Sequence, residues 1–447
     1  MRTSVVAGVD IGSSAIRAAA IDRDGHVVAT STSIPQTEGN SAASAEIDPA
    51  VWLRRLGGVL ADLGDNLTVR ALCIGGQGPT TVAASGERAL TYRYPAGAHD
   101  IPVLQHAAQA EVLLGRFGEQ AQPRLMWDFL LSRLGGASGV QSVWPTMDPM
   151  PGFGTPVPVG ASVGVSSGVH GIPPGITLVP GANDAFLTLW GCAIDTPGLG
   201  FDPGGRSGGL GVAVATGAHR VPTEYSLPSH VPGVQIVGGP VASHGAMLEW
   251  WAGVAGRRIP DLIDSAAAVP PGSHGVIVLP FLEGERAPRW EPGLRAEMTG
   301  LGPDTDTAVV TRALLESTAY GLAHIAASLA DQGVELDRVV CSGSPSRSDL
   351  WTSIKASVLG VPIDVPECTH MAAYGAALGA GSSLGWWPLP GEGRAGDWPT
   401  PGVRTLDPSP SPVYEEGLRR FISLGDAAAA RLGEYSRADR EAGRLVQ

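Results

Sequence analysis

The chain has 447 residues, of which 43% are hydrophobic and 16% are charged, and its formal net charge is −13. This length predicts two or three domains, and the composition is typical of a compact, loop-rich globular protein rather than a disordered one. The acidic balance argues against nucleic acid and anionic membranes as partners, since both need a concentrated basic surface. A small-molecule partner fits better.

The first residues predict a strand rather than a secretory signal, and no apolar run approaches the roughly 20 residues of a membrane-spanning helix. We therefore expect a cytoplasmic protein with no membrane partner. The 4 cysteines are scattered without a CxxC pair, which indicates neither a zinc site nor a disulfide framework. Lys355 is the only lysine in the chain.

The amino-terminal part predicts three antiparallel strands, a helix and a buried strand. The three strands are β-prone runs separated by tight turns, at residues 4–10, 15–22 and 26–33. Asp48 offers an N-cap for a helix over residues 50–64. The apolar run at residues 68–76 is typical of a buried strand.

A similar order returns later in the chain. A glycine-rich turn between strands, at residues 205–217, precedes a long amphipathic helix, a strand and a second helix, at residues 307–333, 335–344 and 348–360. The two series predict two related α/β halves. Loops and short strands are expected at the Gly- and Pro-rich residues 143–180 and 386–412, and a final amphipathic helix at residues 413–435.

Asp10 ends the first predicted strand, directly before a turn formed by Ile11, Gly12, Ser13 and Ser14. In such a turn backbone N–H groups can face a phosphate while the carboxylate holds its Mg²⁺. An ordinary surface hairpin with a capping Asp fits the same residues, so this motif alone leaves both interpretations open.

Three further features carry chemistry. Asp184 follows a small-residue turn at the front of an apolar helix, where it serves either as a reactive carboxylate or as an N-cap. The glycine turn at residues 204–211 lacks the GxGxxG spacing and a following helix, which excludes a dinucleotide-binding motif. The small-residue turn at residues 341–348 joins a strand to a helix, where a nucleotide can lie against the helix N-terminus.

The order of these four features resembles that of the FGGY family of carbohydrate kinases, in particular its xylulokinase-like members, in the actin-like ATPase superfamily. Four longer stretches support the resemblance, at residues 238–254, 279–301, 347–367 and 371–381. The similarity runs from about residue 5 to about residue 432 and is strongest over residues 275–385.

The resemblance implies an α/β fold with two actin-like (ribonuclease H-like) domains flanking a nucleotide cleft, the first domain being shortened. It places the N-terminal domain at residues 1–220 and the adenosine-binding C-terminal domain at residues 221–447. The implied reaction is ATP-dependent phosphorylation of a hydroxyl group of a sugar, ketose, polyol or cyclitol-like substrate. ATP and Mg²⁺ are the implied cofactors, and a monomer and a homodimer are both compatible with the family.

The resemblance also assigns residue roles. Asp184 falls at the position of the general base, and Asp10 and Asp184 at the metal site. Gln77 and Gly78, with Asp184, fall in the acceptor site. The residues assigned to ATP binding are Asp10, Gly12, Ser13, Ser14, Arg17, Gly205, Arg206, Ser207, Gly208, Gly343, Ser344 and Gly375.

Several positions depart from the family pattern. Arg206 stands where the family usually has Thr, and its charge either grips a phosphate or fills the space that the γ-phosphate needs. Pro345 stands where a glycine is usual and lacks a backbone donor. Pro79 replaces a common His, and the family's Trp-x-Asp-x-Arg sugar clamp is absent. These departures leave open an alternative, a catalytically degenerate kinase fold that acts as a sugar- or nucleotide-binding regulatory or scaffold protein.

Overall fold

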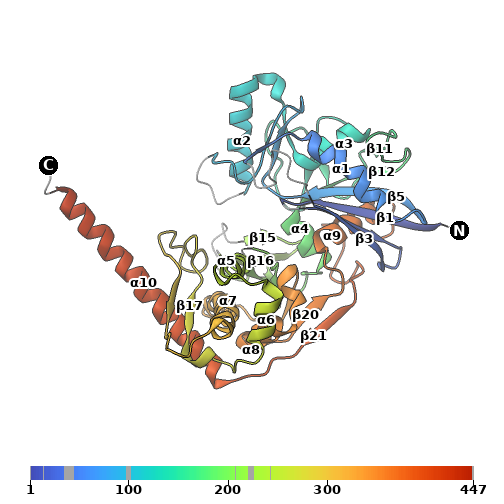
Figure 1. Ribbon diagram of the computed structural model, residues 1–447. Coiled ribbons are helices and arrows are strands. Elements are labelled where there is room, and N and C mark those ends of the chain that lie inside the picture. Colours follow the sequence, from blue (N-terminus) through green and yellow to red (C-terminus); the bar gives the residue numbers. More distant parts are fainter. Residues whose placement is uncertain are drawn as a thin grey trace. The chain divides into compact units, whose positions relative to one another are not determined.

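The computed structural model describes residues 2–13, 15–34, 45–96, 102–206, 208–219, 226–241 and 243–444. The chain packs into two compact units, whose elements are labelled in Figure 1. Unit 1 comprises residues 1–195, 228–234 and 370–402, and unit 2 comprises residues 196–227, 235–369 and 403–447. The chain therefore enters each unit more than once.

The main sheet of unit 1 has the strand order β11-β12-β5-β1-β2-β3. Strands β1, β5 and β12 run parallel to one another, whereas β1, β2 and β3 form the predicted antiparallel series. The bounds are β1 Thr3–Ile11, β2 Ile16–Ile21, β3 Val27–Ser33, β5 Leu67–Gly76, β11 Gly164–Val165 and β12 Thr177–Asn183.

The two faces of this sheet are covered by different helices because side chains alternate along β1. Val5, Val9 and Ile11 point into one hydrophobic core with residues of α1 (Ala50–Ala61) and α3 (Met126–Leu134). Gly8 points the other way, where a Cβ atom would lie only 2.0 Å from the Ala373 carbonyl oxygen of α9 (Met371–Ser383). Helix α9 therefore packs on this face of the sheet with its backbone against the backbone of β1, which leaves no room for a side chain at Gly8.

The rest of unit 1 is built from short elements. A second sheet has the order β4-β7-β6-β8, and β9 pairs with β10 in parallel. The remaining elements are β4 Glu46–Ile47, β6 Thr81–Ala83, β7 Ala89–Leu90, α2 Pro102–Phe117, η1 Glu119–Ala121, β8 Pro123–Leu125, β9 Val140–Val143, β10 Thr155–Pro158 and α4 Asp184–Gly191.

Unit 2 is built around a sheet of order β15-β16-β14-β13-β19-β20-β21. Strand β13 is antiparallel to β14 and parallel to β19, which is in turn parallel to β20. The bounds are β13 Leu199–Asp202, β14 Gly209–Ala215, β15 Ser226–Pro228, β16 Val234–Pro240, β19 Arg338–Cys341, β20 Ile363–Pro366 and β21 Val403–Leu406.

The long helix α7 (Thr307–Ala330) crosses unit 2, and its buried residues contribute to several hydrophobic clusters. As predicted, α8 (Asp349–Leu359) begins after Ser348, whose side chain accepts a hydrogen bond from the Trp351 N–H, and ends at Gly360 with a φ of 73°. The other elements are α5 Gly245–Ala255, α6 Ile259–Ala266, η3 Ser273–Gly275, β17 Ile277–Leu279, β18 Glu297–Thr299, η4 Ser344–Arg347 and α10 Pro412–Arg444.

The two units repeat one strand order. In unit 1 the series β3-β2-β1-β5-β12 begins at an antiparallel hairpin and continues into parallel strands. In unit 2 the series β16-β14-β13-β19-β20 has the same positions, with β13 in the place of β1. This repetition agrees with the two related halves predicted from the sequence.

The division of the chain differs from the predicted boundary at residue 220. Unit 1 ends its first pass at residue 195 and regains residues 370–402, which the sequence placed in the second domain. The reason is α9, whose small residues lie on β1 at Gly8 and on α4 at Gly375. Local patterns of hydrophobicity and turns do not reveal such long-range backbone packing, so the sequence did not predict the return of residues 370–402 to unit 1.

Candidate functional site

The parallel strands of unit 1 bring three predicted site residues to one edge of the sheet. Asp10 pairs with Gly75 across β1 and β5, and Gly76 pairs with Asn183 across β5 and β12. Because parallel strands end at the same edge, Asp10, Gln77 and Asp184 follow one another along it. In open α/β sheets this edge is where ligands bind.

Asp10 is a buried carboxylate that is incompletely paired. Its Oδ2 lies 3.7 Å from Nη1 of Arg17, its partner across the hairpin, and its Oδ1 has no hydrogen-bond partner among the described residues. Burial raises the pKa of Asp10 to about 6, against the opposing charge of Arg17. A buried acid with one free oxygen is unfavourable by itself and suited to a cation.

Asp184 begins α4, but the N-cap of this helix is Asn183, whose Oδ1 accepts a hydrogen bond of 2.8 Å from the Ala185 N–H. The Asp184 carboxylate also accepts from this N–H, at 2.9 Å. Burial, followed by the neighbouring charge of Asp10, raises the pKa of Asp184 to about 7. The helix therefore does not need Asp184 as its cap, and the two acids lie close enough to repel each other.

The predicted acceptor residues lie beside these acids. The Gln77 backbone N–H donates to the Ile11 carbonyl at 2.9 Å, and its buried side-chain amide has no hydrogen-bond partner among the described residues. A Cβ atom on Gly78 would lie 2.3 Å from Nδ2 of Asn183. Gln77 and Gly78 are thus joined to the first hairpin on one side and to the start of α4 on the other.

The residues present fit a divalent cation. Asp10 has an unpartnered buried oxygen, and the charge of Asp10 raises the pKa of Asp184. Carboxylate oxygens are the protein ligands that Mg²⁺ prefers, and it keeps several waters in such sites. A cation bound by Asp10, with Asp184 nearby, would relieve the repulsion between the two acids.

The first hairpin closes as the sequence predicts. The Gly12 N–H donates to the Ala15 carbonyl at 3.0 Å, which makes a tight turn between β1 and β2. Ser13 lies within this turn, and Ser14 lies outside the described residues. The roles of Gly12, Ser13 and Ser14 toward a phosphate stay predictions.

In unit 2 the second glycine turn, between β13 and β14, is fixed by the N-terminus of α5. The carbonyl of Gly205 accepts from the Gly245 N–H at 3.1 Å, and that of Arg206 accepts from the N–H groups of His244 and Ala246 at 2.9 and 3.0 Å. Ser207 lies outside the described residues. Gly208 has a φ of 67° and packs against the His244 ring.

Two residues of this turn face open space. A Cβ atom on Gly205 would meet nothing within 4 Å, so the backbone is accessible there. The exposed guanidinium of Arg206 forms an ion pair with Glu249 of α5. The charge that the sequence singled out at position 206 is therefore compensated within unit 2.

The turn after β19 packs against the second glycine turn. Gly343 has a φ of 75°, and a Cβ atom there would lie 2.8 Å from the Pro203 carbonyl oxygen. Ser344 and Pro345 begin the short helix η4, in whose first turn the missing N–H of a proline is tolerated. Pro345 thus fits the backbone of this turn without a lost hydrogen bond.

Gly375 requires a correction. We expected it to leave room for an adenine face, but it lies in unit 1, where a Cβ atom would fall 1.9 Å from the Leu187 carbonyl oxygen of α4. The space at Gly375 is filled by α4, and its role is the close packing of two helices. We therefore no longer assign Gly375 to nucleotide binding.

The sequence analysis missed Asp202 and Asn183. Asp202 is fully buried in an ion pair with Lys355, at 2.6 Å, beside the second glycine turn. The available signal was the occurrence of a single lysine in a chain otherwise rich in Arg.

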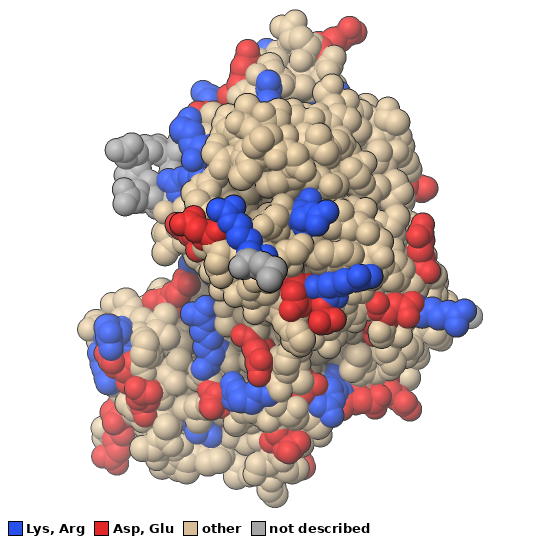
Figure 2. Space-filling model, turned by 90° about the vertical axis from the view of Figure 1, so that its right-hand side faces the viewer, with Lys and Arg blue, Asp and Glu red and all other residues tan. Residues whose placement is uncertain are grey.

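On the face shown in Figure 2, acidic and basic side chains are interspersed, with no continuous basic surface among the coloured residues.

The repeated strand order, with a glycine turn after the first strand of each unit, defines a two-unit α/β fold. Likeness to solved structures supports this. The ligand-bound xylulose kinase from Lactobacillus acidophilus matches with a TM-score of 0.79 at 19% identity, covering 97% of this chain and 100% of that one. The glycerol kinase from Plasmodium falciparum with ADP matches with a TM-score of 0.76 at 15% identity, covering 96% and 98%.

Sequence similarity adds a family model and curated relatives to the likeness in fold. The model of the FGGY family of carbohydrate kinases, C-terminal domain, matches residues 213–384. A glycerol kinase from Gloeobacter violaceus is 32% identical over 187 residues, which are 41% of this chain and 35% of that protein. The matching segments span about a third to a half of the length of the curated relatives. Residues 213–384 are thus identified as an FGGY-type C-terminal domain.

Proposed function

We propose that the chain is an ATP-dependent kinase that transfers a phosphoryl group to a hydroxyl of a small sugar or polyol. The observation that carries this proposal is the pair Asp10 and Asp184 at one sheet edge, with the pKa of Asp184 raised to about 7. A base is most effective when its pKa lies near the working pH. Asp184 is suited to take the proton of an attacking hydroxyl.

The roles of the other residues follow from their contacts. Bound Mg²⁺ would neutralise charge on the phosphates, and Asp10 is its proposed ligand through the free Oδ1. Gln77 orients the acceptor with a buried amide that has both hydrogen-bonding atoms unused among the described residues. In unit 2 the backbone at Gly205 and the turn at Gly343 and Ser344 bind the nucleotide.

The acceptor is proposed only as a class. The sequence relatives are glycerol kinases, whereas the structural likeness includes a xylulose kinase, so a xylulokinase-like acceptor is the narrower form of the proposal. The helices of the described residues are all too short or too polar to span a membrane. We keep a cytoplasmic location and a monomer or homodimer as predictions.

The alternative of a degenerate regulatory protein gains no support from these relatives, which carry the names of kinases. The presence of Asp10 and Asp184 also favours a kinase over a regulatory protein, because a binding protein has no need for a base with a raised pKa.

The proposal is tested with Asp184→Asn in a coupled assay for ADP formation. The variant keeps the shape of the side chain and removes the base, so kcat should fall by at least about a hundredfold, while the Kd for Mg-ATP changes little. Asp48→Asn is the matched control, because the Asp48 side chain contacts α1, at the Ala50 N–H and at Arg54. Activity that survives in Asp184→Asn would show that the base is another residue.

A further inference from the structure

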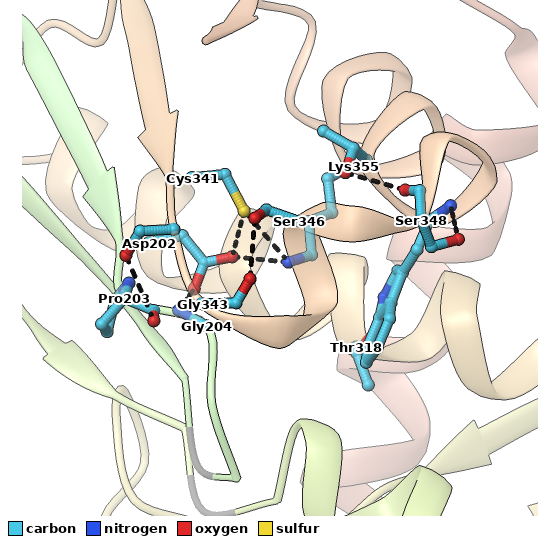
Figure 3. A network of polar contacts seen from close by, with 12 residues as sticks. Asp202, Pro203, Gly204, Thr318, Cys341, Gly343, Ser346, Ser348 and Lys355 are labelled. Atoms are coloured by element: carbon cyan, nitrogen blue, oxygen red, sulfur yellow. Dashed lines mark hydrogen bonds and ion pairs between the residues drawn. The ribbon is translucent and has the colours of Figure 1, made fainter. Parts of the chain in front are cut away.

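Asp202 at the end of β13 uses both oxygens of its buried carboxylate. Oδ1 accepts a hydrogen bond of 2.8 Å from the Gly204 N–H. Oδ2 accepts one of 2.6 Å from Lys355 Nζ and a weaker one of 3.4 Å from Cys341 Sγ. Figure 3 shows these contacts converging on the carboxylate from β19, from α8 and from the turn that follows β13. Asp202 is thus fully satisfied inside unit 2.

Lys355 is held as firmly as its partner. It is fully buried on α8, its Nζ lies 3.6 Å from Cys341 Sγ, and the same Nζ lies 5.2 Å from the centre of the Trp351 ring. Trp351 is anchored in turn, since its Nε1 donates to Thr318 Oγ1 of α7 at 2.8 Å. The ammonium group therefore has an anion, a thiol and an aromatic ring around it.

The pair sits beneath two backbone turns that pack directly on each other. A Cβ atom on Gly204 would lie 2.2 Å from the Ser342 carbonyl oxygen, and one on Gly343 would lie 2.8 Å from the Pro203 carbonyl oxygen. The Ser342 N–H donates to the Asp202 carbonyl at 3.0 Å. The glycine turn and the turn after β19 thus form one block, which leaves no room for side chains between them.

The strand repeat gives Asp202 a counterpart. Asp202 ends β13 as Asp10 stands near the end of β1, and both precede a glycine turn. Asp10 keeps an unpartnered oxygen, whereas both oxygens of Asp202 are taken by donors of the chain itself. Asp202 is therefore not available as a metal ligand, and it needs another explanation.

Stability alone does not explain the pair. Burial, the largest single effect, would raise the pKa of Asp202. The charges of Lys355 and His244, together with the hydrogen bonds from Lys355 and the Gly204 N–H, hold this pKa below its ordinary value, so the pair is ionised. Replacing a buried ion pair by apolar groups is often neutral or stabilising, because desolvation opposes the attraction. A charged pair at this place is better explained by what it holds in position.

We propose that Asp202 and Lys355 are positioning residues that fix the two turns of unit 2, at residues 203–206 and 342–346, in the geometry that binds the nucleotide. The Asp202 carboxylate ties the first turn to α8 through Lys355 and to the second turn through Cys341. The part of this inference that concerns nucleotide binding rests on the proposed function. The part that concerns the fixing of the two turns does not. The two parts are measured separately.

The variants are Asp202→Asn, Lys355→Met and the double change. Hydrogen exchange of peptides covering the two turns, without ligand, reports whether the pair fixes them. Calorimetry with Mg-ADP reports the consequence for binding. Glu316→Gln is the matched control, because it breaks another buried ion pair of unit 2, with Arg312, away from the turns.

In both single variants we expect exchange in the two turns to accelerate, and the Kd for Mg-ADP to rise, by about tenfold or more. The double variant should recover thermal stability, since no unpaired charge remains buried, and still bind Mg-ADP weakly. Glu316→Gln should lose stability without affecting either readout.

Two results would overturn the inference. One is a double variant that binds Mg-ADP within about twofold of the wild type. The other is exchange in the turns that changes no more than in Glu316→Gln. Failure of the proposed function looks different, because the wild type itself would then show no binding of Mg-ADP, while exchange would still decide whether the pair fixes the turns.

Discussion

Asp10 and Asp184 are two carboxylates in different environments at one sheet edge. Asp10 is paired loosely with Arg17 and keeps a free oxygen, which suits a metal ligand. Asp184 has the higher pKa because the charge of Asp10 adds to the effect of burial. The difference between the two environments supports the proposal that Asp10 binds the metal and Asp184 takes the proton.

The raised pKa of Asp184 predicts a pH profile. Only the ionised carboxylate accepts a proton, so kcat/KM should rise about tenfold per pH unit below about pH 7 and level off above it. Mg²⁺ favours the ionised form, so saturating Mg²⁺ should move the midpoint to lower pH. Rates measured across pH at two Mg²⁺ concentrations check both effects. A flat profile through this range would contradict the assignment.

The same shift has a consequence for stability, with the opposite sign. Between the unfolded pKa near 3.8 and the folded pKa near 7, the folded state holds a proton that the unfolded state releases, so rising pH destabilises the ligand-free protein. Asp128 contributes in the same direction, since burial raises its pKa to about 7 as well. Chemical denaturation across this pH range measures the free energy of unfolding of the wild type and of Asp184→Asn. The loss of stability with rising pH should be smaller in the variant, and the difference is the part due to Asp184.

At the scale of elements, the packing of α9 on β1 and α4 brings residues 370–402 into unit 1. Gly375 lets α9 approach α4, and Gly8 lets it approach β1, both at backbone distance. We expect Gly375→Ala to cost about 3 kcal/mol or more of unfolding free energy, because backbone atoms on both helices must move. Chemical denaturation measures this loss.

Gly58→Ala is the control for this prediction. Gly58 lies in α1, where an added Cβ would meet nothing within 4 Å. Gly58→Ala should therefore raise the free energy of unfolding by about 0.5–1 kcal/mol, because alanine favours the helix. A destabilisation by Gly375→Ala no larger than about 0.5 kcal/mol would mean that α9 does not pack on α4 as described.

The elements also show what a sequence can predict. The strands of the first hairpins, α1 and α8 follow from local signals. These are the β-prone runs, the cap Ser348 and the final Gly360 of α8, and Asp48, whose side chain accepts a hydrogen bond from the Ala50 N–H although the N-cap of α1 is Pro49. Gly375 was misread because a glycine that allows helix packing and one that admits a ligand look alike in sequence. Only the neighbouring backbone of α4 distinguishes them.

At the scale of the molecule, the repeated strand order explains why the two glycine turns could be predicted from the sequence. A glycine turn after the first strand of each unit recurs because the topology recurs. The ion pair of Asp202 and Lys355 was not predictable, since it joins residues 153 positions apart. The division into units was missed for a similar reason, since residues 370–402 return to unit 1 through packing alone.

The central claim is that this chain phosphorylates a small hydroxyl compound. The most direct measurement is Mg-ATP consumption by the purified wild type with pentuloses, hexuloses, polyols and cyclitols, alongside Asp184→Asn. We predict that at least one acceptor raises ADP formation well above the hydrolysis seen without acceptor, and that Asp184→Asn abolishes this increase. Binding of Mg-ATP with no acceptor-dependent turnover across all four classes would contradict the claim and favour a regulatory protein.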